Sequence, residues 1–193
     1  MSQDINFQFV RPFGPIICKV SMPKEIIEKL NGYVDKIIKD KKKSNDLDHG
    51  KFLAGNVQQE FKLENNFIED SKWGAFLSNC AKAWIKHTLK QEISKFQLIS
   101  SWIVRQFKNE YNPIHTHGGH LSGVGYLKVP ESFGEYHQKT KVNNQNGMLA
   151  LVHGSKTFMS ESTYVIKPKV GDFYFFPNYL MHTVYPFTGS DEE

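Results

Sequence analysis

The stretch LISSWIVRQFKNEYNPIHTHGGHLSGVGYLKVP, residues 98–130, marks where the apolar pattern of the chain changes from a helical to a strand period. Its first part, LISSWIVRQFKNEY, alternates as a strand does, and LSGVGYLKVP reads as a second strand. Turn residues separate the two at 112–113 and 118–119. We therefore expect a β-rich half beginning near residue 97.

The segments that follow also read as short strands. They are GMLALVHG, TYVIKP, GDFYFFP and HTVYPF, and Gly, Pro and Asn punctuate them. The aromatic cluster in GDFYFFP, residues 171–177, is typical of a core strand. About six strands in succession favour a β-sandwich or jelly roll.

The first half of the chain carries two helical patterns. Apolar residues recur at helical spacing within residues 22–43. A second helix is expected from about residue 70 to 96, and its apolar face consists of Trp73, Phe76, Leu77, Cys80, Trp84 and Leu89. IICKV, residues 16–20, reads as a strand, and residues 57–67 could hold another. We expect an α+β, mainly β fold in a single domain, 1–193, with helical support over about 1–96 and a β core over about 97–193.

Composition excludes several classes of protein. The formal net charge is +4, but the only arginines are Arg11 and Arg105, which argues against sequence-specific nucleic-acid binding. Cys18 and Cys80 are far apart and form no CxxC pair, so we expect no disulfide framework and a reducing cytoplasm. We find no signal peptide and no apolar run long enough to span a bilayer. A cytoplasmic protein with no membrane partner is the expectation.

The histidines of HTH point to a metal centre. His115 and His117 are two residues apart, a spacing that sends both side chains to one face of an extended strand. His182 lies in a later strand that a β-sandwich can place beside this pair. Such a set occupies one octahedral face and leaves the others open, which suits Fe(II). Because all three ligands would be neutral imidazoles, zinc is a competitor.

Two alternatives remain open at this point. His120 would replace His117 as third ligand if the Gly118–Gly119 turn swung it inward, although the spacing of His115 and His117 is better defined. The histidines could also be incidental surface or core residues, as we interpret the remaining four: His49, His87, His137 and His153.

Two segments together resemble the Fe(II)/2-oxoglutarate-dependent oxygenase superfamily. They are NEYNPIHTHGGHLSGVGYLKVP and KPKVGDFYFFPNYLMHTVYPFTGSDEE, and weaker likeness extends over FGPIICKVSMP and LAGNVQQEF. Within that superfamily, the chain resembles the small oxygenases of cyanobacterial tailed phages and marine bacteria. The resemblance implies a double-stranded β-helix, one Fe(II) and 2-oxoglutarate as cosubstrate. The resemblance implies that His115 is the first metal ligand and His182 the distal one. His117 stands at the position of the second ligand, where the family usually has a carboxylate.

The resemblance also implies a cation for the far carboxylate of 2-oxoglutarate. An arginine usually supplies it, on a strand expected roughly ten residues after His182, where this sequence ends at Glu193. Either the chain is truncated just before that strand or another cation serves. Arg105 and Lys128 are the candidates, and Tyr126 is a candidate hydrogen-bond donor. Ordinary strand positions are the alternative interpretation for all three.

The expected activity is that of a dioxygenase that hydroxylates a substrate carbon. YNPIHTH, residues 111–117, resembles the prolyl hydroxylase branch, so a peptide or protein side chain is the first expectation for the substrate. If a phage encodes the protein, the host cytoplasm is its compartment. The sequence leaves two alternative functions open. One is a cupin-like three-histidine dioxygenase that uses no 2-oxoglutarate, and the other is a non-enzymatic β-sandwich binding module.

Overall fold

The structure, a computed structural model, describes residues 6–10, 14–136, 138 and 140–189. Arg11, His137 and residues 191–193, discussed above, lie outside these ranges. The helices are α1 (Lys24–Lys39), α2 (Lys41–Asp46), the short 3-10 helix η1 (Gly50–Phe52), α3 (Asn65–Asp70) and α4 (Trp73–Leu89). The strands are β1 (Phe7–Val10), β2 (Ile17–Ser21), β3 (Gln59–Lys62), β4 (Trp102–Arg105), β5 (Asn112–His115), β6 (Leu121–Gly125), β7 (Leu149–Val152), β8 (Thr163–Ile166), β9 (Asp172–Pro177) and β10 (Met181–Val184).

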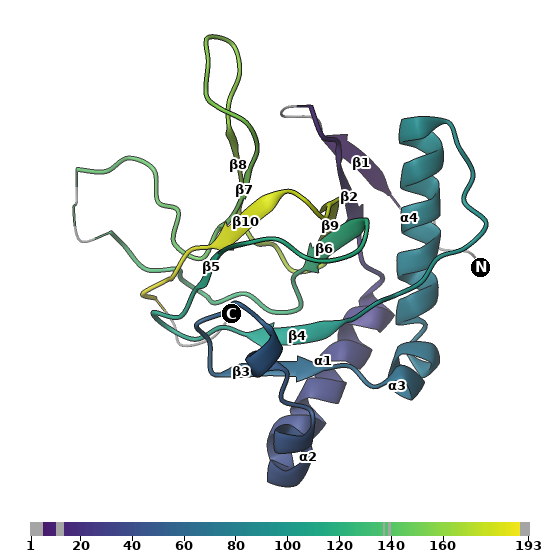
Figure 1. Ribbon diagram of the computed structural model, residues 1–193. Helices are drawn as coiled ribbons and strands as arrows, with labels where there is room; N and C mark the ends of the chain where they lie inside the picture. The colour runs from purple at the N-terminus through teal and green to yellow at the C-terminus, as the bar shows by residue number, and fades with distance from the viewer. Residues whose placement is uncertain (1–5, 11–13, 137, 139, 190–193) are drawn as a thin grey trace.

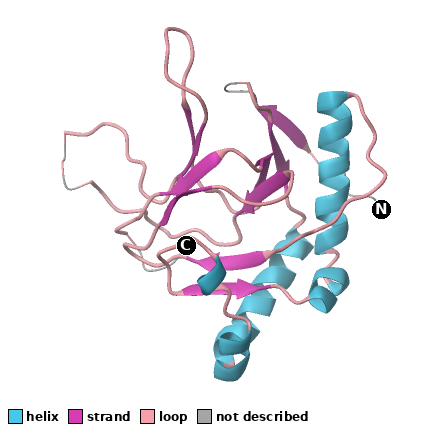
Figure 2. Ribbon diagram, viewed as in Figure 1, coloured by secondary structure: helices cyan, strands magenta, loops and turns pink. Residues whose placement is uncertain are grey.

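The strands form two four-stranded sheets and a two-stranded ribbon. One sheet has the order β1-β2-β9-β6, the other β5-β10-β7-β8, and the ribbon is β3-β4. Every pairing between them is antiparallel. The long helices α1 and α4 lie on one side of the strands (Figures 1 and 2). The mainly β fold with helices packed on a sheet, expected from the sequence, is confirmed, and the antiparallel sheets are compatible with a jelly roll.

Strand β9 connects two hydrophobic cores because its side chains alternate between them. Phe173 and Phe175 pack in the core between the first sheet and helices α1 and α4. Tyr174 and Phe176 pack in the core between the two sheets, with Leu149 and Leu151 of β7 among others. All four aromatic residues of β9 are at most 5% exposed, as the apolar run GDFYFFP predicts.

Two glycines of β6 allow the aromatic residues of β9 to pack closely. A Cβ atom at Gly123 or Gly125 would lie about 2.6 or 2.5 Å from the ring of Phe173. Phe173 in turn has its ring 5.5 Å from that of Trp73 in α4. The glycine face of β6 therefore points toward the helices, and the side chains of Ser122 and Val124 point to the opposite face, between the sheets.

The first expected helix is divided in two. Asp40 has an extended backbone, with φ −115° and ψ 100°, and its carboxylate accepts hydrogen bonds from the backbone N–H groups of Lys42 and Lys43. It therefore caps a second helix, α2. The sequence pattern placed the lysines at 41–43 at the end of one helix. In the structure they stand in the first turn of α2, where a positive charge interacts unfavourably with the helix dipole.

The second expected helix is shorter than its pattern. Helix α4 ends at Leu89, where Lys90 adopts a left-handed conformation with φ 58°. Leu89, expected on the apolar face, is consequently exposed. The other predicted apolar residues of this helix are buried: Trp73, Phe76, Leu77, Cys80 and Trp84.

The first half of the chain also supplies strands to the sheets. The strand expected in IICKV is β2, which pairs with β9, and the one expected in residues 57–67 is β3. Strand β1, which the sequence did not predict, extends the sheet beyond β2. Among the described residues, no helix is both long and apolar enough to cross a membrane.

Candidate metal centre

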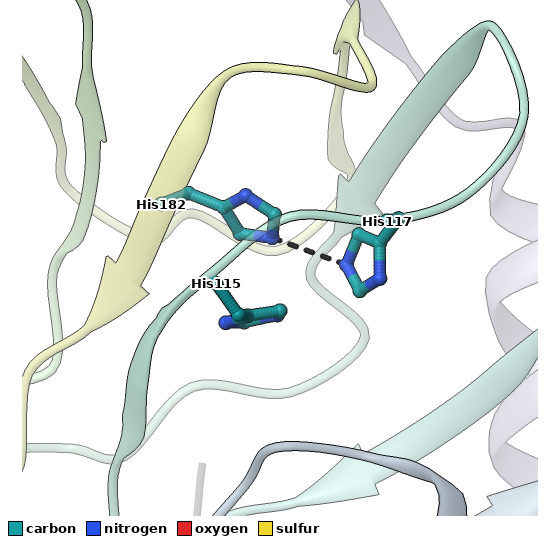
Figure 3. A group of neighbouring side chains, drawn as sticks. All are labelled: His115, His117 and His182. Atoms are coloured by element: carbon teal, nitrogen blue, oxygen red, sulfur yellow. Dashed lines mark hydrogen bonds between the residues drawn. The ribbon is translucent and has the colours of Figure 1, made fainter.

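Two of the three histidines face each other across a pair of strands. Strands β5 and β10 are antiparallel neighbours, with His115 directly opposite His182. Opposed residues of antiparallel strands project to the same face of the sheet. Their rings lie with centroids 4.2 Å apart, and Figure 3 shows both directed into the space beside the strands.

The third histidine lies just past the end of β5. His117 is two residues beyond His115, and the side chain of Asn178 donates a hydrogen bond of 3.2 Å to its carbonyl. The backbone N–H of Asn178 donates to the carbonyl of His120 at 3.1 Å. Asn178 therefore attaches this segment to the end of β9. Figure 3 shows the ring of His117 beside those of the other two histidines.

The imidazole nitrogens of the three histidines converge. The Nε2 atoms of His117 and His182 are 3.1 Å apart, and the ligand atoms of all three residues lie within 4.8 Å of one another. Two nitrogens that bind one metal at about 2.1 Å and at a right angle would be about 3.0 Å apart. Within the described part of the chain, this is the one cluster of His, Cys, Asp or Glu found to have such geometry.

Backbone carbonyls fix two of the rings in the tautomer that a metal requires. His115 Nδ1 lies 2.7 Å from the carbonyl of Pro113, and His182 Nδ1 lies 3.0 Å from that of Leu180. Because a carbonyl can only accept, each Nδ1 carries the proton and each Nε2 keeps its lone pair. Such carbonyl partners orient metal-binding imidazoles.

Burial keeps two of the rings neutral. The pKa of His182 is lowered to about 4, mainly by burial and to a smaller extent by the neighbouring His115 and His117, while the Leu180 carbonyl acts in the opposite direction. Burial also lowers the pKa of His117, with a smaller effect of His115. Neutral imidazoles are metal ligands, so these residues fit a divalent ion without first losing protons.

Aromatic side chains border the cluster on two sides. The ring of Trp102 lies 5.4 Å from that of His117, edge to face, and the ring of Phe176 lies 5.0 Å from that of His182. Ile103, the next residue of β4, packs against the core that contains the helices. Because side chains alternate along a strand, Trp102 faces away from that core. The sequence did not assign Trp102 or Asn178 to the site, because nothing in its pattern shows that β4 and the β9–β10 turn reach it.

The residues expected to bind 2-oxoglutarate are dispersed. Tyr126 is 8% exposed and packs in the core between the sheets. The ammonium of Lys128 lies 3.6 Å from Asp35 of α1, on the helix side of the first sheet. Arg105 donates to Gln59 at 2.5 Å, and its guanidinium lies 5.1 Å from the ring centroid of Phe107. The structure therefore places Tyr126 inside the sandwich and Lys128 outside it, and their roles stay predictions.

The alternative ligand lies apart from the cluster. His120 is exposed and is not one of the converging residues. Its backbone carbonyl, rather than its imidazole, takes part in the Asn178 contacts. The structure therefore favours His117 over His120 as the partner of His115 and His182.

The fold and the cluster together define a class: a β-sandwich protein with a three-histidine candidate metal centre. Residues 100–193, slightly less than half of the chain, match the family model described as "Putative 2OG-Fe(II) oxygenase". This segment spans β4 to β10 and contains all three histidines. The match supports the oxygenase superfamily and suggests iron as the metal. No curated protein matches the chain.

Proposed function

We propose that the protein is an Fe(II)- and 2-oxoglutarate-dependent dioxygenase that hydroxylates a carbon atom of an organic substrate. The observation that carries this proposal is the convergence of His115, His117 and His182, with the Nδ1 protons of two of them already committed to backbone carbonyls. Support for 2-oxoglutarate comes from the family match, since the cluster alone would accept several divalent metals.

The residues of this chain would prepare the site rather than perform the redox step. When bound, Fe(II) supplies open coordination positions and the chemistry that couples decarboxylation of the 2-oxo acid to activation of dioxygen. His115 and His182 orient their Nε2 atoms through the carbonyls of Pro113 and Leu180. Trp102 and Phe176 border the imidazoles with apolar surface, which excludes water beside them.

His117 changes the charge of the site. A carboxylate ligand would cancel part of the charge of a divalent ion, whereas three neutral imidazoles leave both positive charges in place. We therefore propose weaker Fe(II) retention than a carboxylate site would give. The same uncompensated charge favours an anionic chelating ligand, as a 2-oxo acid is.

For the substrate, we propose a peptidyl side chain, with proline as the first one to test. The support is the likeness of YNPIHTH to the prolyl hydroxylase branch. We propose no nucleic-acid partner, since arginine is so scarce.

Metal analysis and cosubstrate turnover test the proposal. Protein loaded anaerobically with Fe(II) should bind about one iron per chain and, with oxygen, convert 2-oxoglutarate to succinate. His182→Ala should lose stoichiometric iron and reduce turnover by ~100-fold or more, because two ligands hold a divalent ion poorly. His120→Ala is the matched control and should retain both. Iron loss in His120→Ala but not in His117→Ala would contradict the ligand assignment.

A second candidate function rests on the same three histidines. An all-histidine ligand set also suits a cupin-like dioxygenase that uses no 2-oxoglutarate. Bound metal with oxygen consumption, but with no dependence on 2-oxoglutarate, would favour that enzyme. Failure to bind any divalent metal would favour a non-enzymatic binding module.

A further inference from the structure

Helix α4 carries three lysines on the side that faces away from the sheets. Lys82, Lys86 and Lys90 are exposed and recur every four residues, a spacing that places side chains on one face of a helix. The helix dipole favours Lys86 and Lys90, which stand at the C-terminal end. Lys82 lies a turn earlier, and like charges at this spacing repel. The stability of the helix alone therefore does not explain this lysine face.

The charge of the lysine face is only partly compensated. After α4 the chain turns back along the outer side of the helix toward β4 (Figure 1), and Glu92 of this segment pairs with Lys86 at 2.6 Å. For the side chains of Lys82 and Lys90, the described residues provide no ion pair. Three lysines and one glutamate leave two positive charges without a partner.

Two adjacent open hollows border Lys86. The first, of about 220 Å³, is lined by Lys82, Ala83, Lys86, Glu92 and Ile93. The second, of about 480 Å³, is lined by Ala83, Lys86, His87 and Lys90. Ala83 and the aliphatic stems of the lysines provide apolar surface in both.

An exposed leucine adds to the apolar surface of the lysine face. Leu89 is three residues after Lys86 and seven after Lys82, so it shares their side of the helix, and it is 60% exposed. The lysine face thus combines positive charge with exposed apolar groups.

We propose that the lysine face of α4 binds an acidic segment of another polypeptide, whose apolar side chains lie against Leu89 and in the two hollows. Lysine ammonium groups are point charges on flexible stems, which attract carboxylates without requiring one fixed geometry. Helix α4 packs on the first sheet, whereas the histidines lie on the second sheet and the segment after β5. A partner on α4 therefore leaves the candidate metal centre open, and the proposal does not depend on a bound metal.

A polypeptide fits the lysine face better than other polyanions do. Surfaces that bind single-stranded nucleic acids combine basic groups with aromatic rings on which bases stack. The ring that lines the second hollow, His87, is already stacked on Phe9 of β1, with centroids 4.1 Å apart. An anionic membrane surface requires a broad apolar face, and Leu89 is the one exposed large apolar side chain of α4.

Fluorescence anisotropy with a labelled acidic peptide, EELDELEE, tests the proposal. The unaltered protein should bind this peptide at low salt. The peptide QQLNQLQQ, which keeps the leucines but has no charged side chain, should bind at least about tenfold more weakly. The double variant Lys82→Gln, Lys90→Gln should bind EELDELEE about 3- to 10-fold more weakly, as should Leu89→Ser.

The matched control is the double variant Lys36→Gln, Lys39→Gln, which removes the same charge from exposed positions at the end of α1. It should bind the peptide within about twofold of the unaltered protein. No binding of the peptide, or an equal loss in both double variants, would overturn the proposal. Tighter binding of single-stranded oligothymidylate or of phosphatidylserine vesicles than of the peptide, lost in Lys82→Gln, Lys90→Gln, would assign the lysine face to another polyanion and would overturn it as well.

Discussion

Trp102 offers a direct report on the candidate metal centre, because its ring is in contact with His117. The other two tryptophans, Trp73 and Trp84, belong to α4 and pack in the core on the helix side of the first sheet. Binding of a paramagnetic ion such as Co(II) should therefore quench the fluorescence of Trp102 more than that of the other two.

The expected result is partial quenching that saturates with Co(II) in the unaltered protein. Trp102→Phe should bind Co(II) but lose most of the quenching, whereas Trp84→Phe should keep it. Fluorescence titration, with cobalt content measured separately, checks this. Undiminished quenching in Trp102→Phe would show that the metal binds elsewhere.

At the scale of single residues, the sequence predicted which histidines cluster better than it predicted their surroundings. The spacing of His115 and His117 and the position of His182 in a later strand were sufficient to select three residues that the fold brings together. Asn178 was not predicted as part of the site, because its role depends on a backbone carbonyl that only the folded chain places beside it.

At the scale of elements, strand existence was well predicted and helix ends were not. The period-2 pattern and the turn residues located β4 and β6 to β10, since burial imposes that pattern on each strand. Strand β5 was not predicted, because it begins at Asn112 and Pro113, where a turn was expected. The break at Asp40 was missed because lysine is a good helix former and the apolar spacing gave no reason to stop. Strand β1 was missed because proline and glycine follow it closely.

Glu60 makes the stability of the β3–β4 ribbon sensitive to pH. It is 2% exposed, and its Oε2 has no hydrogen-bond partner. Burial, with smaller effects of the nearby Asp48 and Glu110, raises the pKa of this carboxyl from 4.5 to about 7. The folded state therefore holds a proton that the unfolded state releases above pH 4.5, so this group lowers stability as pH rises from 4.5 to 7.

Glu60→Gln removes that titration while keeping the shape of the side chain. At pH 8 the variant should be more stable than the unaltered protein by at most about 3 kcal/mol, and the difference should disappear below pH 4.5. Urea unfolding between pH 4 and 8 measures it. Glu69→Gln, at an exposed position of α3, is the control and should change little. A stability difference that is constant with pH would contradict the assignment.

At the scale of the whole molecule, the two halves of the chain form one set of layers. Strand β2 from the first half lies between β1 and β9, and helices α1 and α4 cover the face that β9 and β6 share. The sequence predicted helices on a sheet but not this insertion of an N-terminal strand, because partner choice between strands depends on long-range packing. The histidines lie on the second sheet and on the segment that Asn178 ties to the first.

A metal bound by the three histidines would consequently stabilise the molecule as a whole. It would join β5, the segment after it and β10, which come together only in the folded chain. A ligand present at 100 times its dissociation constant adds about 2.7 kcal/mol to the free energy of unfolding. For a chain of this length, that should raise the melting temperature by about 5–10 °C.

Calorimetric scans with Zn(II) and with a chelator measure the shift. His182→Ala should abolish it and His120→Ala should retain it, since only the former loses an imidazole of the cluster. An equal shift in both variants would place the stabilising metal away from these histidines.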